Sequence, residues 1–74
     1  MAGRKLRDLK PNQVVRAFER AGFTLSRVAG SHYILTRPGT SVISIPRHST
    51  VKVGLLLAKI KAAGMSYDDF EELL

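Results

Sequence analysis

The 74-residue sequence contains no cysteine and no tryptophan, and it has no long apolar run. The lack of cysteine excludes disulfide bonds and thiol chemistry, and it weakens any case for a structural zinc site. No apolar stretch approaches the roughly 20 residues that a membrane-spanning helix needs. The basic N-terminus contains no apolar segment typical of a signal peptide. We therefore expect a cytoplasmic protein without a membrane partner.

Acidic residues are scarce outside the C-terminus. The first 64 residues contain all 12 basic side chains and only two acidic ones, Asp8 and Glu19, whereas residues 65–74 contain four acidic side chains and no basic one. Two-metal phosphodiester chemistry needs clustered carboxylates, so a metal-dependent nuclease is not expected. We predict no metal site and no other cofactor. The positive charge favours a polyanionic partner such as a nucleic acid.

Hydrophobic periodicity predicts a helix, three strands and two further helices. Pro11 suits the first turn of a helix, and Gly22 is typical of a helix end. The turn signals Gly30-Ser31 and Pro38-Gly39-Thr40 separate segments that are rich in β-branched and aromatic residues, which indicates an antiparallel meander. The expected elements are a helix at 11–21, strands at 23–29, 32–37 and 41–45, a helix at 51–63 and a short helix at 67–74.

We predict an α+β domain in which a three-stranded antiparallel sheet packs under two helices, with a short C-terminal helix added. The order helix, three strands, helix is that of the double-stranded-RNA-binding fold. Residues 1–9 are expected to form a basic N-terminal arm, and residues 10–74 a single domain. In the second helix, Leu55-Leu56-Leu57 is expected to supply core residues and one exposed leucine. Because a domain this short has a small core, its site should be an open groove.

The two histidines, His32 and His48, are candidates for acid–base chemistry. RNA carries its own nucleophile, the 2′-hydroxyl beside each phosphodiester, and an imidazole can accept or donate a proton at neutral pH. His32 follows Gly30, which allows close approach of the backbone, and Ser31, which offers a hydroxyl and an N–H to a phosphate. The alternative is that His32 is an ordinary, half-exposed strand residue.

Other residues are candidates for holding an RNA backbone beside His32. For His48, the alternatives are a loop residue hydrogen-bonded to the backbone and a second role in binding or proton transfer. Tyr33 is equally compatible with stacking on an unpaired base and with packing under a helix. The predicted RNA-binding residues lie in the turn before His32 or near it, and most are basic: Arg27, Gly30, Ser31, Arg37, Arg47, His48 and Lys52.

The order and spacing of several motifs resemble the HicA toxins from about Leu9 to the C-terminus. The motifs include Ala21-Gly22-Phe23, Gly30-Ser31-His32, Ile45-Pro46-Arg47-His48 and Ala63-Gly64-Met65. The resemblance implies a double-stranded-RNA-binding-like αβββα fold and an mRNA interferase that blocks translation. It also implies that His32 is the catalytic histidine, that no metal is needed, and that a HicB antitoxin covers the active face.

Three positions depart from what this family commonly carries. Ala29 replaces a basic residue before Gly-Ser-His, and Leu55 and Leu57 replace a threonine and an arginine at the second helix. The departures remove two cations and a hydroxyl, but they leave His32 in place.

The sequence therefore predicts a toxin endoribonuclease that cleaves mRNA by metal-independent acid–base catalysis centred on His32. DNA should not be a substrate, because it lacks the 2′-hydroxyl. Two alternatives remain open. One is a non-catalytic module that binds double-stranded RNA, and the other is an inactive remnant that binds only the antitoxin.

Overall fold

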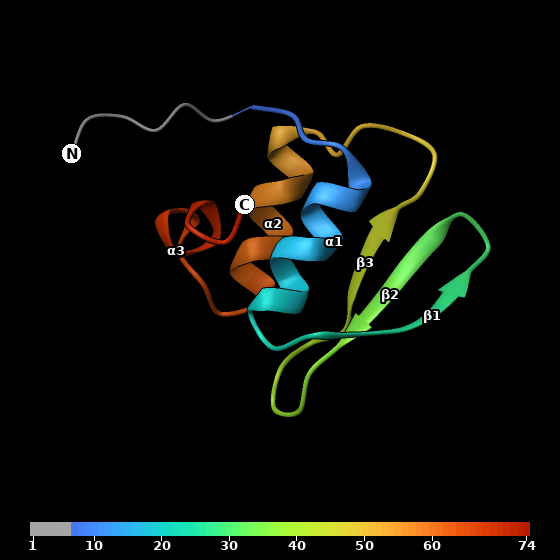
Figure 1. Cartoon of the computed structure of the whole chain (residues 1–74), viewed down its shortest axis with the longest axis horizontal. Helices are drawn as coiled ribbons and strands as arrows, with labels where there is room; N and C mark the ends of the chain where they lie inside the picture. Colours follow the sequence, from blue (N-terminus) through green and yellow to red (C-terminus); the bar gives the residue numbers. More distant parts are fainter. Residues whose placement is uncertain (1–6) are drawn as a thin grey trace.

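The structure, a computed structural model, describes residues 7–74. This part of the chain forms three helices and three strands in the predicted order, which confirms the predicted α+β fold (Figure 1). The ends differ slightly from those expected, and the third strand lies later in the chain. The elements are α1 (Pro11–Arg20), β1 (Thr24–Ala29), β2 (His32–Thr36), β3 (Ile43–Pro46), α2 (Val53–Ala62) and α3 (Tyr67–Glu71).

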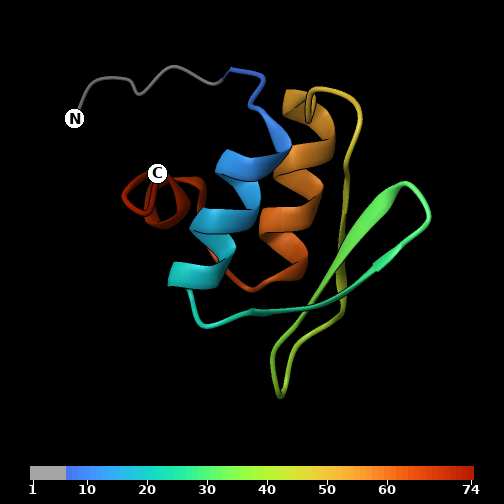
Figure 2. The same ribbon diagram turned by 45° about the vertical axis from the view of Figure 1, so that its right-hand side comes forward.

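The sheet has the antiparallel order β1-β2-β3, and α1 and α2 lie side by side on the same side of it (Figures 1 and 2). Leu35 pairs with Ile43, and Tyr33 pairs with Ile45. Leu35, Ile43 and Ile45 are fully buried. Because strand residues alternate between faces, the intervening residues of β2 and β3 point to the other face, which we call the open face. The helices pack on the opposite side, although the Lys59 side chain of α2 reaches Ser44 on the open face.

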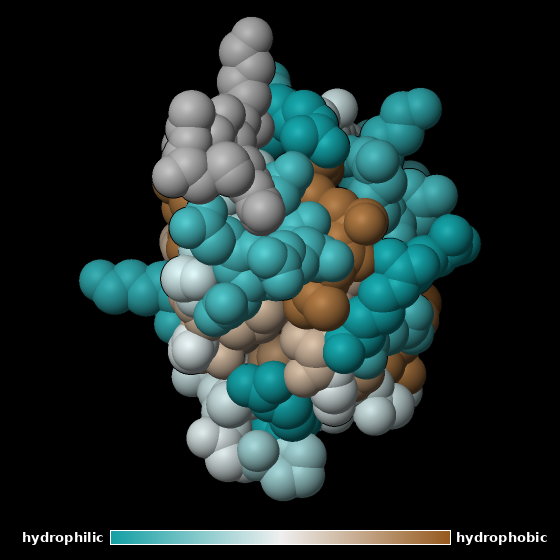
Figure 3. Space-filling view, turned by 60° about the vertical axis from the view of Figure 1, so that its left-hand side comes forward, coloured by the Kyte–Doolittle hydropathy of each residue, from teal (hydrophilic) through white to brown (hydrophobic). Residues whose placement is uncertain are grey.

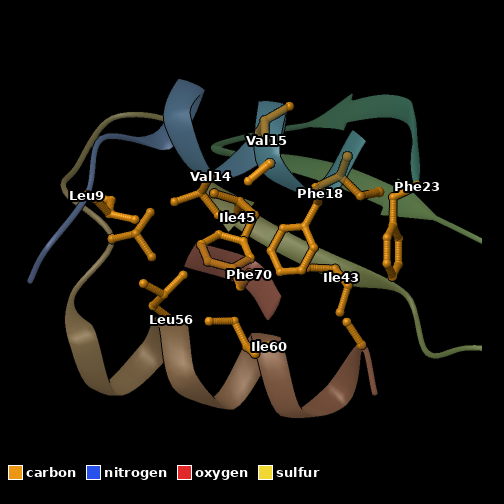
Figure 4. Close-up of a cluster of buried hydrophobic side chains, with 14 residues drawn as sticks. Leu9, Val14, Val15, Phe18, Phe23, Ile43, Ile45, Leu56, Ile60 and Phe70 are labelled. Atoms are coloured by element: carbon orange, nitrogen blue, oxygen red, sulfur yellow. The ribbon is translucent and has the colours of Figure 1, made fainter. Parts of the chain in front are cut away.

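A cluster of aromatic rings lies at the centre of the core (Figure 4). The ring of Phe18 lies 5.4 Å from that of Phe23 and 5.0 Å from that of Phe70. Phe18 and Phe70 are completely buried, so this cluster joins α1, the start of the sheet and α3. The buried core residues are Leu9, Val14, Val15, Ala17, Phe18, Phe23, Leu35, Ile43, Ile45, Val51, Leu56, Ile60, Ala63 and Phe70.

The segment before α1 does not end where the sequence predicted. Leu9, which we placed in the basic arm, is only 3% exposed and belongs to the core. Its backbone exchanges two hydrogen bonds with Val51, of 3.1 and 2.8 Å. A carboxylate oxygen of Asp8 accepts a hydrogen bond of 3.0 Å from the N–H of Val53, the first residue of α2. The arm prediction is therefore wrong for Asp8 and Leu9, which are part of the domain, and residues 1–6 lie outside the described chain.

Helix α2 buries a narrow stripe and leaves more leucine exposed than the sequence predicted. Leu56, Ile60 and Ala63 are buried at helical spacing. Leu55 and Leu57 are 39% and 36% exposed, so two leucines, not one, face outward. The helix is also shorter than expected, because Val51 pairs with Leu9 instead of starting the helix.

The C-terminal segment is fastened to the rest of the domain. The Ser66 hydroxyl caps α3 by accepting a hydrogen bond from the N–H of Asp69. Arg20 donates a hydrogen bond of 2.6 Å to the carbonyl of Leu73.

On the side that carries α3, hydrophilic side chains border exposed apolar ones (Figure 3). Among the described residues, no helix is long and apolar enough to cross a membrane.

The contact between Asp8 and Val53 predicts that Asp8 stabilises the start of α2. A side-chain oxygen that caps a helix N-terminus contributes typically about 1 kcal/mol. We expect Asp8→Ala to lower the free energy of unfolding, measured by urea denaturation, by about that amount. Asp8→Asn keeps an oxygen acceptor and should retain most of the stability. Equal destabilisation by both substitutions would show that the negative charge, and not the cap, matters.

Candidate active site

The turn between β1 and β2 sets the position of His32. Gly30 has a φ of 60°, a left-handed conformation that favours glycine. A two-residue turn with glycine first fits the tight hairpins that match the twist of the strands. His32 is consequently the first residue of β2, directly after the turn, and its side chain is exposed.

Arg47, which directly follows β3, forms hydrogen bonds with this turn. Its backbone N–H donates a hydrogen bond of 2.7 Å to the carbonyl of Ser31. Its Nη1 donates one of 3.2 Å to the carbonyl of Gly30. Its guanidinium also lies 5.8 Å from the centre of the Tyr33 ring. Arg47, predicted to bind RNA, therefore holds the turn that carries His32.

His32 lines a groove of about 660 Å³ between the open face of the sheet and α2. Register explains why sheet residues reach it: His32 pairs with Pro46 and Ile34 pairs with Ser44, so His32 and Ser44 share the open face. The opposite wall comes from one face of α2. The lining residues are His32, Ser44, Pro46, Ser49, Thr50, Lys52, Leu55 and Lys59.

The charge of this groove is positive. Lys59 is partly buried, and its Nζ donates a hydrogen bond of 3.3 Å to the Ser44 hydroxyl across the groove. Lys52 is exposed, and its Nζ lies 3.8 Å from a carboxylate oxygen of Asp8. Among the lining residues, all within the described chain, none is acidic. Exposed ion pairs such as Lys52–Asp8 are weak, so the Lys52 ammonium is available to an anionic ligand. An ammonium has three N–H donors, so Lys59 retains two besides the one that it gives to Ser44.

The imidazole of His32 is available for proton transfer. It is exposed, and within residues 7–74 it has no hydrogen-bond partner. A general base must reach the proton that it removes, and a ring at the wall of an open groove meets this requirement. Within the same described residues, no three His, Asp or Glu side chains lie close enough together to hold a metal ion.

The two predicted arginines on the strands have different positions. Arg27 pairs with Ile34, and Ala29 pairs with His32, so Arg27 lies on the same open face as His32. Arg37 follows the far end of β2. It donates hydrogen bonds of 2.7 and 2.9 Å to the carbonyls of Ala21 and Ala63.

The structure therefore does not place Arg37 beside His32, where the sequence predicted it. Its guanidinium also stacks on the Phe23 ring at 4.4 Å, so the side chain joins the ends of α1 and α2. Arg37 was predicted to lie near the turn because the predicted strand at 32–37 contains both His32 and Arg37. However, five residues of extended chain, at about 3.3 Å each, separate it from His32.

His48 lies at a second groove, of about 410 Å³. Its side chain is exposed and does not line the groove of His32. The two grooves share Ser49 and Thr50, so these two residues form a ridge between them. The residues that line only the second groove are Lys10, Pro11, Asn12, Tyr33, Arg47 and His48.

Sequence reasoning missed Lys59 and Ser44. Neither residue was among the predicted site residues. Lys52, Leu55 and Lys59 are spaced at i, i+3 and i+7, which places them on one helix face. That spacing could have linked Lys59 to Lys52. Nothing in the sequence indicated that Ser44 faces this helix.

Comparison with known proteins supplies the family. A family model described as the HicA toxin of bacterial toxin-antitoxin matches residues 11–65. No curated protein and no solved structure matches the chain. The matched segment contains α1, the whole sheet, α2 and every residue that lines the groove of His32. Because the match covers well over half of the 74 residues, the chain belongs to the HicA toxin family of bacterial toxin–antitoxin systems.

Proposed function

We propose that this toxin is an endoribonuclease that cleaves mRNA and so blocks translation, with His32 as its catalytic residue. One observation carries the proposal: an exposed imidazole with no hydrogen-bond partner within residues 7–74 lines a groove that also contains two lysines. Membership of the family supports a toxin. The groove supports the proposed chemistry, because it contains one imidazole that can accept a proton and two ammonium groups that can stabilise negative charge.

In the proposed reaction, the RNA backbone lies in the groove with one phosphate near His32. The 2′-oxygen attacks the phosphorus as its proton passes to the imidazole. The bond from phosphorus to the 5′-oxygen, which lies opposite the attacking 2′-oxygen, then breaks. The 5′-oxygen takes a proton from water, and the imidazolium returns its own proton to solvent. The products are a 2′,3′-cyclic phosphate and a 5′-hydroxyl. Lys52 and Lys59 stabilise the negative charge that develops on the phosphorane.

The family also implies an antitoxin partner. We infer that a HicB-type antitoxin neutralises the toxin by covering the groove of His32. Leu55 supports this assignment, because it is 39% exposed beside Lys52 and Lys59 and would be buried under a partner.

The proposal predicts that His32→Ala abolishes cleavage without unfolding the protein. Loss of the acid–base group should lower the cleavage rate by about 100-fold or more. Replacing an exposed histidine should change stability little. Cleavage of a labelled RNA and thermal unfolding, measured on the same preparations, test both statements. In cells, the wild-type chain should stop growth and His32→Ala should not.

Three results would contradict this assignment. Cleavage by His32→Ala at the wild-type rate would remove His32 from the reaction. Salt-sensitive binding by a wild-type protein that leaves RNA intact would favour the non-catalytic RNA-binding alternative. If the wild-type chain binds an antitoxin but neither binds nor cleaves RNA, the inactive remnant is the better description.

Lys59 allows a test with a matched control on the same helix. Removing one group that stabilises transition-state charge typically costs about 100-fold in rate, so we expect Lys59→Gln to slow cleavage by at least about tenfold. Lys61→Gln removes the same charge from an exposed position that does not line this groove. It should cleave nearly as fast as the wild type. Equal losses in the two variants would indicate that only overall charge matters.

A further inference from the structure

The second groove lies on the other side of β2 and β3 from His32. Tyr33 follows His32 in β2, so the two side chains point to opposite faces of the sheet. The start of α1 provides one wall, with Lys10 and Asn12, and the other wall carries Arg47 and His48. Because Ser49 and Thr50 line both grooves, a chain that crosses this ridge passes directly from one groove to the other.

The groups in this groove suit an unpaired nucleotide. Tyr33 is half-buried, and its hydroxyl has no hydrogen-bond partner within residues 7–74. No buried side-chain nitrogen or oxygen atom in the described chain lacks a partner, so this hydroxyl must be accessible to solvent. The Arg47 guanidinium lies near the ring, and the exposed His48 imidazole lines the same groove. Aromatic rings and guanidinium planes stack with unpaired bases.

The second groove is also positively charged. Lys10 is exposed and lines the wall opposite Arg47, so the groove carries two cations that can attract a phosphate group. None of the lining residues, all of which are described, is acidic. The groove therefore contains an aromatic ring and an imidazole that can stack on a base, and two cations that can attract a phosphate group. Surfaces that bind single-stranded nucleic acids combine the same two kinds of group.

We propose that the second groove binds the nucleotide next to the one cleaved, so that a single RNA strand crosses the ridge formed by Ser49 and Thr50. This inference rests on the proposed ribonuclease function, and it narrows the substrate to unpaired RNA. A base that is paired in a duplex cannot turn to stack in the groove. The toxin should therefore cut single-stranded regions, although its fold resembles that of double-stranded-RNA-binding domains.

The test compares two oligonucleotides that cannot be cleaved because every ribose carries a 2′-O-methyl group. A dinucleotide is too short to occupy both grooves, and a pentanucleotide spans them. Fluorescence anisotropy at fixed salt gives both affinities. Since base stacking is typically worth tenfold or more in affinity, the wild type should bind the pentanucleotide at least about tenfold more tightly. The Tyr33 ring resonances should shift in NMR spectra only with the longer oligonucleotide.

Substitutions then locate the gain in affinity. In His48→Ala and Lys10→Gln, the ratio of the two affinities should fall towards one. Lys61→Gln is the matched control, because Lys61 is exposed and lines neither groove, and it should keep the wild-type ratio. Equal reduction in all three variants, or an unchanged ratio in His48→Ala and Lys10→Gln, would overturn the proposal.

The two proposals fail in distinguishable ways. If the wild type binds the pentanucleotide more tightly than the dinucleotide but does not cleave RNA, the ribonuclease is refuted and the second groove remains a binding site. If the wild type cleaves RNA but binds both oligonucleotides equally tightly, only the second groove is refuted. If neither oligonucleotide binds, the second groove is refuted whatever the cleavage assay shows.

Discussion

Two hydrogen bonds from Arg47 to the carbonyls of Ser31 and Gly30 hold the candidate site together. The hairpin of β1 and β2 extends past the helices, and Val28 near its end is 47% exposed. Few core contacts fix that end, so the bonds from Arg47, worth about 1 kcal/mol each, have a large effect on its position. The chain then continues from Arg47 into the ridge that lines both grooves. One residue therefore couples the position of His32 to the rest of the site.

The other wall of the site depends on residues that precede α1. Leu9 pairs with Val51, and Asp8 caps the first turn of α2. These contacts fix the end of α2 from which Lys52 extends, and Lys59 lies two turns further along the same face. The result is an open groove assembled from the sheet, the ridge and α2. Such a groove suits a polymer that lies across the surface better than a small molecule that needs an enclosed cavity.

The sequence predicted the order of the elements because its local signals agree. Gly22 and Gly64 end helices, and Gly30-Ser31 marks a turn. His32 was singled out from the same turn, because Gly30 allows close approach of a ligand and Ser31 offers a hydroxyl and an N–H to a phosphate. Local signals do not describe contacts between distant segments, which is why Lys59, Ser44 and the core position of Leu9 were missed. Arg37 was misplaced because shared membership of a strand says nothing about which end of the strand lies near the site.

The central claim is that the RNA itself supplies the nucleophile and that His32 moves its proton. The most direct measurement is the chemical nature of the ends after cleavage in the presence of EDTA, determined by mass spectrometry of a short RNA. The account predicts a 2′,3′-cyclic phosphate, or the 2′- or 3′-phosphate formed when it hydrolyses, together with a 5′-hydroxyl. It also predicts no cleavage when the ribose at the cut site is replaced by deoxyribose. A 5′-phosphate with a 3′-hydroxyl, or cleavage that requires added divalent metal, would contradict it.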